Sequence, residues 1–240
     1  MSKAPDISVV VLCYRLEDDI RDFVAQLEKE MEEDHVDYEL VLVANYDKGS
    51  SDRTPEIIKE LAGGKERIKV VSTEKKGRMG WDMRSGLNAS TGNNIAVIDG
   101  DGQMPVSDIP IVYKILKTGR YDLVKTYRAR RYDGFYRSTL TFLYNLLFRI
   151  LFHPEFPTLD INSKPKIFTR AAYEKMNLVS NDWFTDAEIM IEAFRNKVRI
   201  CSVSTVFYKN ERRKSMVGAA TILEFIYNLF YYRIKLWKLK

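Results

Sequence analysis

The chain has 240 residues, enough for one large domain or for one domain with a short appendage, and its 45% hydrophobic and 30% charged residues argue against disorder. Its formal net charge is +5, and clusters of Lys and Arg in the second half favour a polyanionic partner such as phosphate groups or an anionic lipid. The two histidines lie far from the two cysteines in the sequence, which argues against a zinc site.

Strand-like and helix-like patterns alternate along the first half of the chain. Continuous runs of β-branched and aliphatic residues predict buried strands at 7–14, 38–46, 67–73, 94–101 and 121–128. Helical spacing of apolar residues predicts intervening helices at 17–32, 54–61, 81–89 and 107–117. This alternation is typical of βαβ units, so we expect an α/β fold with a mainly parallel, Rossmann-like sheet flanked by helices.

The second half is less regular. Its patterns predict an aromatic helix at 135–152, a strand at 166–169, helices at 170–176 and 185–196, and a strand at 198–208. A long helix rich in aromatic residues is expected at the end. We therefore divide the chain into a main domain at 1–215 and a C-terminal amphipathic helix at 216–240.

Targeting and membrane-spanning signals are weak in this sequence. Strand-like residues begin directly after Asp6, which argues against a signal peptide. No uninterrupted apolar run reaches the roughly 18 to 20 residues that a membrane-spanning helix needs, and the nearest candidate, 139–152, carries Arg149. Cys13 and Cys201 lie in apolar runs, so we expect buried thiols in a reducing compartment.

An acidic turn follows the strand expected at 94–101. Ligands of parallel α/β sheets bind at the carboxyl ends of the strands, and here that end reads Asp99-Gly100-Asp101-Gly102-Gln103. The freedom of Gly100 lets the carboxylates of Asp99 and Asp101 converge. Together with Gln103 they would bind a hard divalent cation, Mg²⁺ or Mn²⁺, and through it substrate phosphates. The alternative is a polar turn with no ligand.

Other nucleotide-binding motifs are absent from the sequence. It contains no GxxxxGK[ST], which disfavours a P-loop NTPase, and no GxGxxG after the first strand, which disfavours a dinucleotide site. It also contains no recognised nucleic-acid-binding motif, so we expect no nucleic-acid partner.

Taken together, the motifs between residues 7 and 215 resemble the family-2 glycosyltransferases of GT-A fold, and most closely the polyprenyl-phosphate (dolichol-phosphate type) hexosyltransferases. The elements that carry the resemblance occur in family order: Leu12-Cys13-Tyr14, the loop at 49–54, Lys76-Gly77-Arg78, the acidic turn at 99–103, Asp160-Ile161-Asn162-Ser163, Asp186-Ala187-Glu188 and the basic run Arg212-Arg213-Lys214-Ser215. The resemblance implies that residues 1–215 form a GT-A catalytic domain.

Two loops depart from the family pattern. The first reads Tyr14-Arg15-Leu16-Glu17, where the family has Tyr-Asn-Glu, and the second, at 44–50, has a two-residue insertion. Both loops form the base and ribose pocket of the family. The sequence therefore leaves open whether the donor is UDP-linked or GDP-linked.

The resemblance implies roles for individual residues. Those that would contact the nucleotide-sugar donor are Cys13, Tyr14, Glu17, Asn45, Asp47, Gly77, Arg78, Asp99 and Gly100, and those that would hold the metal are Asp99, Asp101 and Gln103. Asp101 is also expected to take part in catalysis. The implied reaction is an inverting transfer of a hexose from a nucleoside-diphosphate sugar to a polyprenyl-phosphate lipid.

Two kinds of acceptor and a non-catalytic role remain open from the sequence. A lipid phosphate is already anionic and needs only cations to hold it, for which Arg128, Arg131, Arg212 and Arg213 are candidates. A saccharide or glycolipid hydroxyl needs a general base, which would be Asp186 or Asp160. The third possibility is a membrane-associated scaffold that has kept the fold.

The apolar segments at 139–152 and 219–240 determine the expected location. Aromatic residues with flanking cations are typical of a helix in the membrane interface, so we expect a peripheral protein at the cytoplasmic face of a membrane. The alternative is that the two helices pack on each other or form a homo-oligomer contact.

Overall fold

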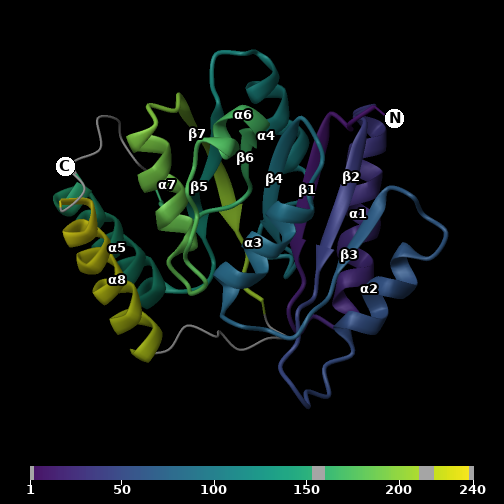
Figure 1. The fold of residues 1–240 in the computed structure, drawn as a ribbon, viewed down its shortest axis with the longest axis horizontal. Helices are drawn as coiled ribbons and strands as arrows, with labels where there is room; N and C mark the ends of the chain where they lie inside the picture. Colours follow the sequence, from purple (N-terminus) through teal and green to yellow (C-terminus); the bar gives the residue numbers. More distant parts are fainter. Residues whose placement is uncertain (1–2, 153–159, 211–218, 238–240) are drawn as a thin grey trace.

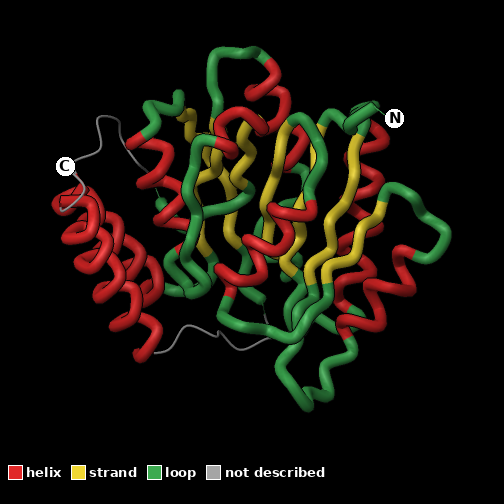
Figure 2. Tube along the Cα trace, in the orientation of Figure 1, coloured by secondary structure: helices red, strands yellow, loops and turns green. Residues whose placement is uncertain are grey.

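The computed structural model describes residues 3–152, 160–210 and 219–237. Within these residues seven strands form one sheet in the order β3-β2-β1-β4-β6-β5-β7 (Figures 1 and 2). The strands are β1 (Ile7–Leu12), β2 (Tyr38–Val43), β3 (Ile68–Val71), β4 (Asn94–Asp99), β5 (Leu123–Arg131), β6 (Lys166–Thr169) and β7 (Ile200–Phe207). Each of them overlaps a strand predicted from the sequence.

The sheet is mainly parallel, as the sequence predicts. β1 runs parallel to both β2 and β4, β2 runs parallel to β3, and β5 runs parallel to β7. β6 is the exception, because it lies antiparallel between β4 and β5. This insertion places the residues just before β6 beside the carboxyl end of β4.

Helices cover both faces of the sheet (Figure 1). They are α1 (Asp19–Glu33), α2 (Thr54–Ala62), α3 (Met79–Ala89), α4 (Asp108–Lys117), α5 (Phe135–Phe152), α6 (Arg170–Glu174), α7 (Thr185–Arg195) and α8 (Ala219–Trp237). The predicted C-terminal helix is therefore present as α8. The boundary expected at residue 215 lies outside the described residues.

Strand β1 shows why the sheet must be covered on both faces. All six of its residues are buried, and successive side chains of a strand point to opposite faces. Val9 and Val11 belong to the core cluster under α1, α2 and α4, whereas Val10 and Leu12 belong to the cluster under α3 and α7. A continuous apolar run is thus the sequence signature of a strand in the middle of this fold.

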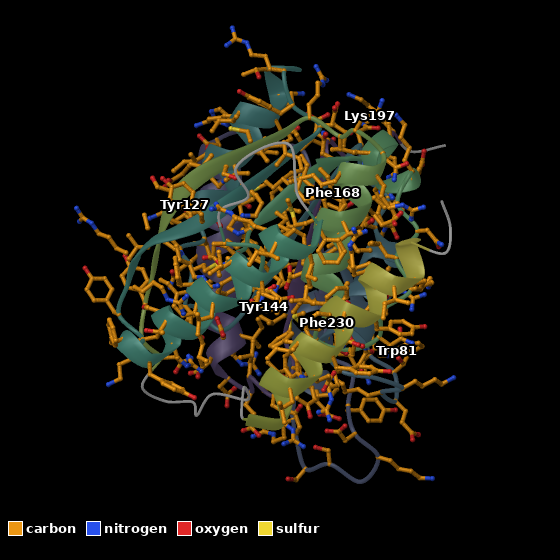
Figure 3. The ribbon with its side chains drawn as sticks, turned by 90° about the vertical axis from the view of Figure 1, so that its left-hand side faces the viewer. Trp81, Tyr127, Tyr144, Phe168, Lys197 and Phe230 are labelled. Atoms are coloured by element: carbon orange, nitrogen blue, oxygen red, sulfur yellow. The ribbon has the colours of Figure 1, made fainter. Side chains whose placement is uncertain are left out.

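α5 and α8 lie side by side at one end of the molecule, next to α7 (Figures 1 and 3). Their inner faces close a third apolar cluster that includes Phe148, Phe184 and Leu229. Tyr144 of α5 packs on Phe225 of α8, with ring centroids 5.4 Å apart. In the part of the chain that the structure describes, no helix is both long enough and apolar enough to cross a membrane.

A close contact between α3 and the sheet gives a test of the fold. A Cβ on Gly86 would lie 2.4 Å from Val10 Cγ1 and 2.7 Å from Val43 Cγ2. We expect Gly86→Ala to lower the free energy of unfolding by about 1–3 kcal/mol, because a buried, tightly packed site cannot accept another methyl group. Urea denaturation measures this. Asn88→Ala, on the exposed side of the same helix, should change it by less than about 0.5 kcal/mol.

Candidate functional site

A cavity of about 690 Å³ runs along the carboxyl ends of the strands, from β1 to the α5–α8 pair. Its volume is in the usual range for small-molecule sites. At one side of the sheet the wall includes Tyr14 after β1, Asp47 after β2, Lys75 after β3 and Asp82 of α3. In the middle, near β4 and β6, it includes Asp99, Asp101, Gln103 and Lys164. Near β5 it includes Arg128, Arg131 and Arg137. Apolar residues of α5 and α8 close the far end.

Tyr14 and Asp47 form the wall at the β1 end. The Tyr14 hydroxyl donates to Asp47 Oδ2 at 2.5 Å, and a guanidinium nitrogen of Arg15 lies 3.1 Å from the same oxygen. The Tyr14 hydrogen bond is the largest influence on the pKa of Asp47 and lowers it. Burial and this hydrogen bond raise the pKa of Tyr14 to about 12. Asp47 is therefore a carboxylate acceptor fixed beside an aromatic ring.

Buried polar side chains next to Tyr14 form a connected set of hydrogen bonds and an ion pair. Lys75 forms an ion pair with Asp82, and its ammonium lies 3.8 Å from the Tyr14 ring centroid. Asn45 donates to Asp82 Oδ1 at 2.9 Å and accepts from the Thr73 N–H at 2.9 Å. Asn45 is fully buried and is not part of the cavity wall, and its hydrogen bond holds Asp82 in position, so its contact with a donor stays a prediction.

The acidic pair predicted from the sequence faces the cavity. Asp99, Asp101 and Gln103 all line it, and the turn between them is closed by a hydrogen bond from the Gln103 N–H to Asp101 Oδ1, at 3.0 Å. Gly102 has a φ of +69°, a conformation that glycine adopts without strain. Gln103 Nε2 donates to the Tyr208 carbonyl at 3.1 Å.

The donor set fits a hard divalent cation. Two carboxylates and an amide supply oxygen ligands, which Mg²⁺ and Mn²⁺ prefer. No group of three or more His, Cys, Asp or Glu side chains that could hold a metal occurs within residues 3–152, 160–210 and 219–237. A cation bound at Asp99 and Asp101 would therefore complete its coordination with water or with oxygens of a ligand, as Mg²⁺ commonly does.

Asp186 lies in the centre of the cavity wall and is fully engaged in ion pairs. Its Oδ2 is 2.9 Å from Lys164 Nζ, and its Oδ1 pairs with Lys166 Nζ. Burial acts to raise the pKa of Asp186, but the charges of Lys164 and Lys166 outweigh burial and lower it. A carboxylate with a lowered pKa is a weak proton acceptor, which argues against the general-base role considered for Asp186.

Asp160 is likewise committed to an ion pair, and it does not line the cavity. Its two oxygens accept from Arg128 Nε at 2.6 Å and from Arg128 Nη2 at 2.5 Å. Burial raises the pKa of Asp160 less than Arg128 lowers it, and the result is about 2. The role of Asp160 as a base stays a prediction, and its ion pair with Arg128 and its position outside the cavity wall argue against it.

Two further arginines line the cavity near α5. Arg131 donates to both carboxylate oxygens of Asp133, at 2.9 and 2.6 Å, and to Thr141 Oγ1 at 2.7 Å. Arg137 lies 3.6 Å from the same carboxylate. The arginines predicted at 212 and 213 fall outside the described residues, so only Arg128 and Arg131 of that predicted set have a described position.

The turn between β3 and α3 also contributes to the cavity wall. Gly77 and Arg78 line it, as predicted, and the Arg78 N–H donates to the Asn181 carbonyl at 2.6 Å. A Cβ on Gly77 would lie 2.5 Å from that carbonyl oxygen, so only glycine allows this contact. The guanidinium of Arg78 lies 3.7 Å from Glu224 of α8.

With this geometry in place, comparisons with known proteins identify the family. The family model described as Glycosyl transferase family 2 matches residues 8–180. The chain belongs to this family. An undecaprenyl-phosphate 4-deoxy-4-formamido-L-arabinose transferase from Proteus mirabilis (strain HI4320) is 29% identical over 147 residues, which are 60% of this chain and 44% of that protein. The match thus spans less than half the length of this curated relative.

Solved structures agree with this glycosyltransferase fold. Mannosyl-3-phosphoglycerate synthase from Rubrobacter xylanophilus has a TM-score of 0.74 at 16% identity, covering 97% of this chain and 75% of that one. A mannosyltransferase from Pyrobaculum calidifontis, solved in complex with GDP-Man and Mn²⁺, has a TM-score of 0.61 at 17% identity, covering 88% of this chain and 59% of that one. These likenesses support the GT-A fold predicted from the sequence.

Besides Asn45, three residues predicted to contact the donor do not line the cavity. Cys13 is fully buried in the core under α1, where its thiol donates to the Val11 carbonyl and burial raises its pKa. Glu17 is exposed outside the cavity wall. Gly100 is buried, and a Cβ there would lie 3.0 Å from Ile20, so it allows close packing under the acidic turn. Contact of these residues with a donor stays a prediction, since none of them belongs to the cavity wall.

Some residues of the cavity were missed in the sequence. Lys164, Lys75, Asp82 and Arg137 line it although no family motif pointed to them. Tyr144, Asn162 and Trp183 also line it, and each has one buried polar atom without a hydrogen-bond partner among the described residues. The available signal was the run Ser163-Lys164-Pro165-Lys166, which leads directly into the apolar residues of a predicted strand. Lysines next to a buried strand need carboxylate partners, so the run could have indicated a buried charged site.

The Asp160–Arg128 pair gives a stability prediction. Asp160→Asn leaves a buried guanidinium without its carboxylate, so we expect the free energy of unfolding at pH 7 to fall by about 3 kcal/mol. Because the pKa of Asp160 is lowered to about 2 in the folded protein, its contribution is present above the unfolded pKa of about 4 and is lost as pH falls from there through 2.

Urea denaturation between pH 7 and pH 2 measures this contribution. The curve for Asp160→Asn should be flatter than that of the unmodified protein below pH 4. Asp122→Asn, which breaks the more exposed pair with Arg199, is the matched control and should cost less than about 1 kcal/mol. Equal losses in the two variants would contradict the assignment.

Proposed function

We propose that this chain is an inverting glycosyltransferase that moves a hexose from a UDP- or GDP-linked sugar to a polyprenyl-phosphate lipid at a membrane surface. The observation that carries the proposal is one cavity in which three features meet. These are the oxygen ligands of Asp99 and Asp101, the arginines 128, 131 and 137, and an apolar wall made by α5 and α8. A donor diphosphate, an acceptor phosphate and a lipid chain need these three environments.

The donor base fits the β1 end of the cavity. The Tyr14 ring offers an apolar surface, and the Asp47 carboxylate beside it can accept an N–H from uracil or guanine. Gly77 and Arg78 lie along the same wall, toward Asp99. Asp99 then stands between the nucleoside and the diphosphate, as the family resemblance implies.

A bound Mg²⁺ or Mn²⁺ would be held by Asp99, Asp101 and Gln103. When bound, such a cation supplies positive charge that offsets the charge developing on the leaving diphosphate. The Mn²⁺ in the structure of the Pyrobaculum calidifontis neighbour supports this choice of metal.

The acceptor phosphate fits the arginines near α5. Arg131 is held in place by Asp133 and Thr141, so its fork is oriented before a ligand binds. The adjoining apolar residues of α5 and α8 suit the first part of a lipid chain: Leu140, Leu143, Leu147, Phe225 and Ile226. The printed name of the Proteus mirabilis relative includes undecaprenyl phosphate, which supports this acceptor class.

The chemistry then needs no strong base. An oxygen of the acceptor phosphate is already anionic and attacks the anomeric carbon, while the bond from that carbon to the donor diphosphate breaks on the opposite side. The configuration is inverted, and the electron pair of the broken bond stays on the diphosphate. A hydroxyl acceptor is disfavoured, because Asp186 and Asp160, the carboxylates considered as bases, are both held in ion pairs.

The outer faces of α5 and α8 support a position at the membrane surface. Large apolar side chains are exposed on both helices, among them Phe142, Leu146, Ile150, Tyr227, Phe230 and Ile234. Arg233 and Lys235 are exposed near the end of α8, where they would meet anionic headgroups. We propose that α8 (Ala219–Trp237) is an interfacial helix at the cytoplasmic face, attached to the catalytic domain. A homo-oligomer contact through the same faces is the competing arrangement.

Asp101→Ala tests the proposed catalytic function. We expect transfer of radiolabelled sugar from UDP- or GDP-sugars to undecaprenyl phosphate to fall on the order of 100-fold or more, because a ligand of the activating cation is lost. Label in the organic phase is the readout, with Mn²⁺ present. Asp18→Ala, on an exposed carboxylate that does not line the cavity, should keep full activity.

Two results would contradict the proposal. A folded Asp101→Ala protein with full activity would remove the metal assignment. No binding of any UDP- or GDP-sugar by the unmodified protein, measured calorimetrically with Mn²⁺, would favour the non-catalytic scaffold instead.

The membrane assignment is tested with Phe142→Ser combined with Phe230→Ser. The side chains are 65% and 46% exposed, so we expect little loss of stability. Sedimentation with anionic liposomes should show a partition coefficient roughly 10- to 100-fold lower, since each buried aromatic side chain contributes about 1.5–3 kcal/mol at most. Ile111→Ser, on the exposed face of α4, is the control and should leave partitioning unchanged. Unchanged partitioning in the double variant, with loss of a dimer, would favour the oligomer contact.

A further inference from the structure

Lys164 stands at the point where the acidic turn, the ion-paired Asp186 and the cavity meet. Its ammonium lies 3.1 Å from Asp99 Oδ2 and 2.9 Å from Asp186 Oδ2. The side chain is only 3% exposed, yet it lines the cavity. The insertion of β6 beside β4 produces this position, because Lys164 comes two residues before β6 begins.

The three hydrogen-bond acceptors of the Lys164 ammonium differ in strength. A lysine ammonium has three N–H donors, and two of those of Lys164 face carboxylates. The third faces the thioether sulfur of Met79 at 3.5 Å. A thioether is a weak acceptor, so an anionic oxygen in the cavity would be a much stronger partner for this donor.

The neighbouring lysines lack this access. Lys166 also pairs with Asp186, and it donates to the Ser163 carbonyl at 2.9 Å. Lys125 donates to the carbonyls of Thr126 and Asp160, at 2.7 and 2.9 Å. Neither side chain is part of the cavity wall. Lys164 is thus the member of this buried cluster that a ligand can reach.

We propose that Lys164 binds the diphosphate of the nucleotide sugar, donating its third N–H to a phosphate oxygen. The inference rests on the proposed glycosyl transfer and assigns it a second cationic group, supplied by the protein itself. As the bond from the anomeric carbon to the diphosphate oxygen breaks, the electron pair moves onto the diphosphate, and the Lys164 hydrogen bond strengthens. No proton is transferred in this step.

The test compares Lys164→Met with Lys166→Met. Both changes remove one buried cation next to Asp186, and each leaves Asp186 with the other lysine as a partner. Isothermal calorimetry measures the Kd of UDP, GDP, uridine and guanosine, with Mn²⁺ and separately with EDTA. Thermal unfolding reports whether each variant is folded.

We expect Lys164→Met to weaken binding of UDP or GDP, whichever the unmodified protein binds, so that its Kd rises about 10- to 100-fold. This is the loss expected when one hydrogen bond between charged groups is removed. The Kd of the corresponding nucleoside should not change, and the ratio should persist in EDTA. Lys166→Met should change either Kd by less than about 3-fold. If Lys166→Met is unfolded, Lys164→Arg replaces it as the control and should recover most of the affinity.

Each contrary result has a distinct meaning. An unchanged diphosphate Kd in folded Lys164→Met overturns the assignment of Lys164 and leaves the proposed function intact. A loss that appears with Mn²⁺ and disappears in EDTA shows that Lys164 acts only through Asp99, which also overturns direct binding. If the unmodified protein binds no nucleoside diphosphate at all, the proposed function fails together with this inference.

Discussion

The two ion pairs of the buried Lys164 side chain, with Asp186 and with Asp99, are the interaction on which the arrangement of the cavity depends. Asp186 belongs to the first turn of α7, Lys166 begins β6, and Lys164 reaches Asp99 at the end of β4. Burying these charges costs free energy that their mutual attraction repays only when the geometry is good, so such a group is weak evidence for stability. Its evident effect is positional, since it fixes one helix and two strands relative to the acidic turn.

The outline of the fold and the centre of the site could be predicted from the sequence. Unbroken β-branched runs mark strands buried on both faces, and the rule that ligands bind at carboxyl ends of parallel strands led directly to Asp99 and Asp101. The insertion of β6 could not be predicted, because a strand of four residues, two of them apolar, does not reveal which strands it pairs with or in which direction. Lys164 was missed for that reason. The ion pair of Asp160 could not be predicted either, because its partner, Arg128, lies 32 residues away in the sequence.

The same limit applies to side-chain direction. Cys13 and Tyr14 are neighbours in the sequence, yet one points into the core under α1 and the other faces the cavity. A shift of one residue reverses the direction of a side chain in extended backbone, and the end of a strand is where sequence patterns locate that register least well. For α5 and α8 the packing of the two helices on each other is confirmed, whereas contact with a membrane stays a prediction. Their inner faces pack together around Phe148 and Leu229, and their outer faces remain apolar and exposed.

The pairing of charges around the cavity has a consequence for how ligands enter it. Many of the basic residues on its wall already lie within ion-pair distance of a carboxylate: Lys75, Arg78, Arg128, Arg131, Arg137 and Lys164. The cavity wall therefore carries little net charge, despite its many charged groups. A diphosphate that binds together with a divalent cation is itself nearly neutral. When it binds, the charged side chains of the wall change their ion-pair partners, and no charge is left uncompensated. Binding of this kind depends on matching geometry more than on long-range attraction, and should be comparatively insensitive to ionic strength.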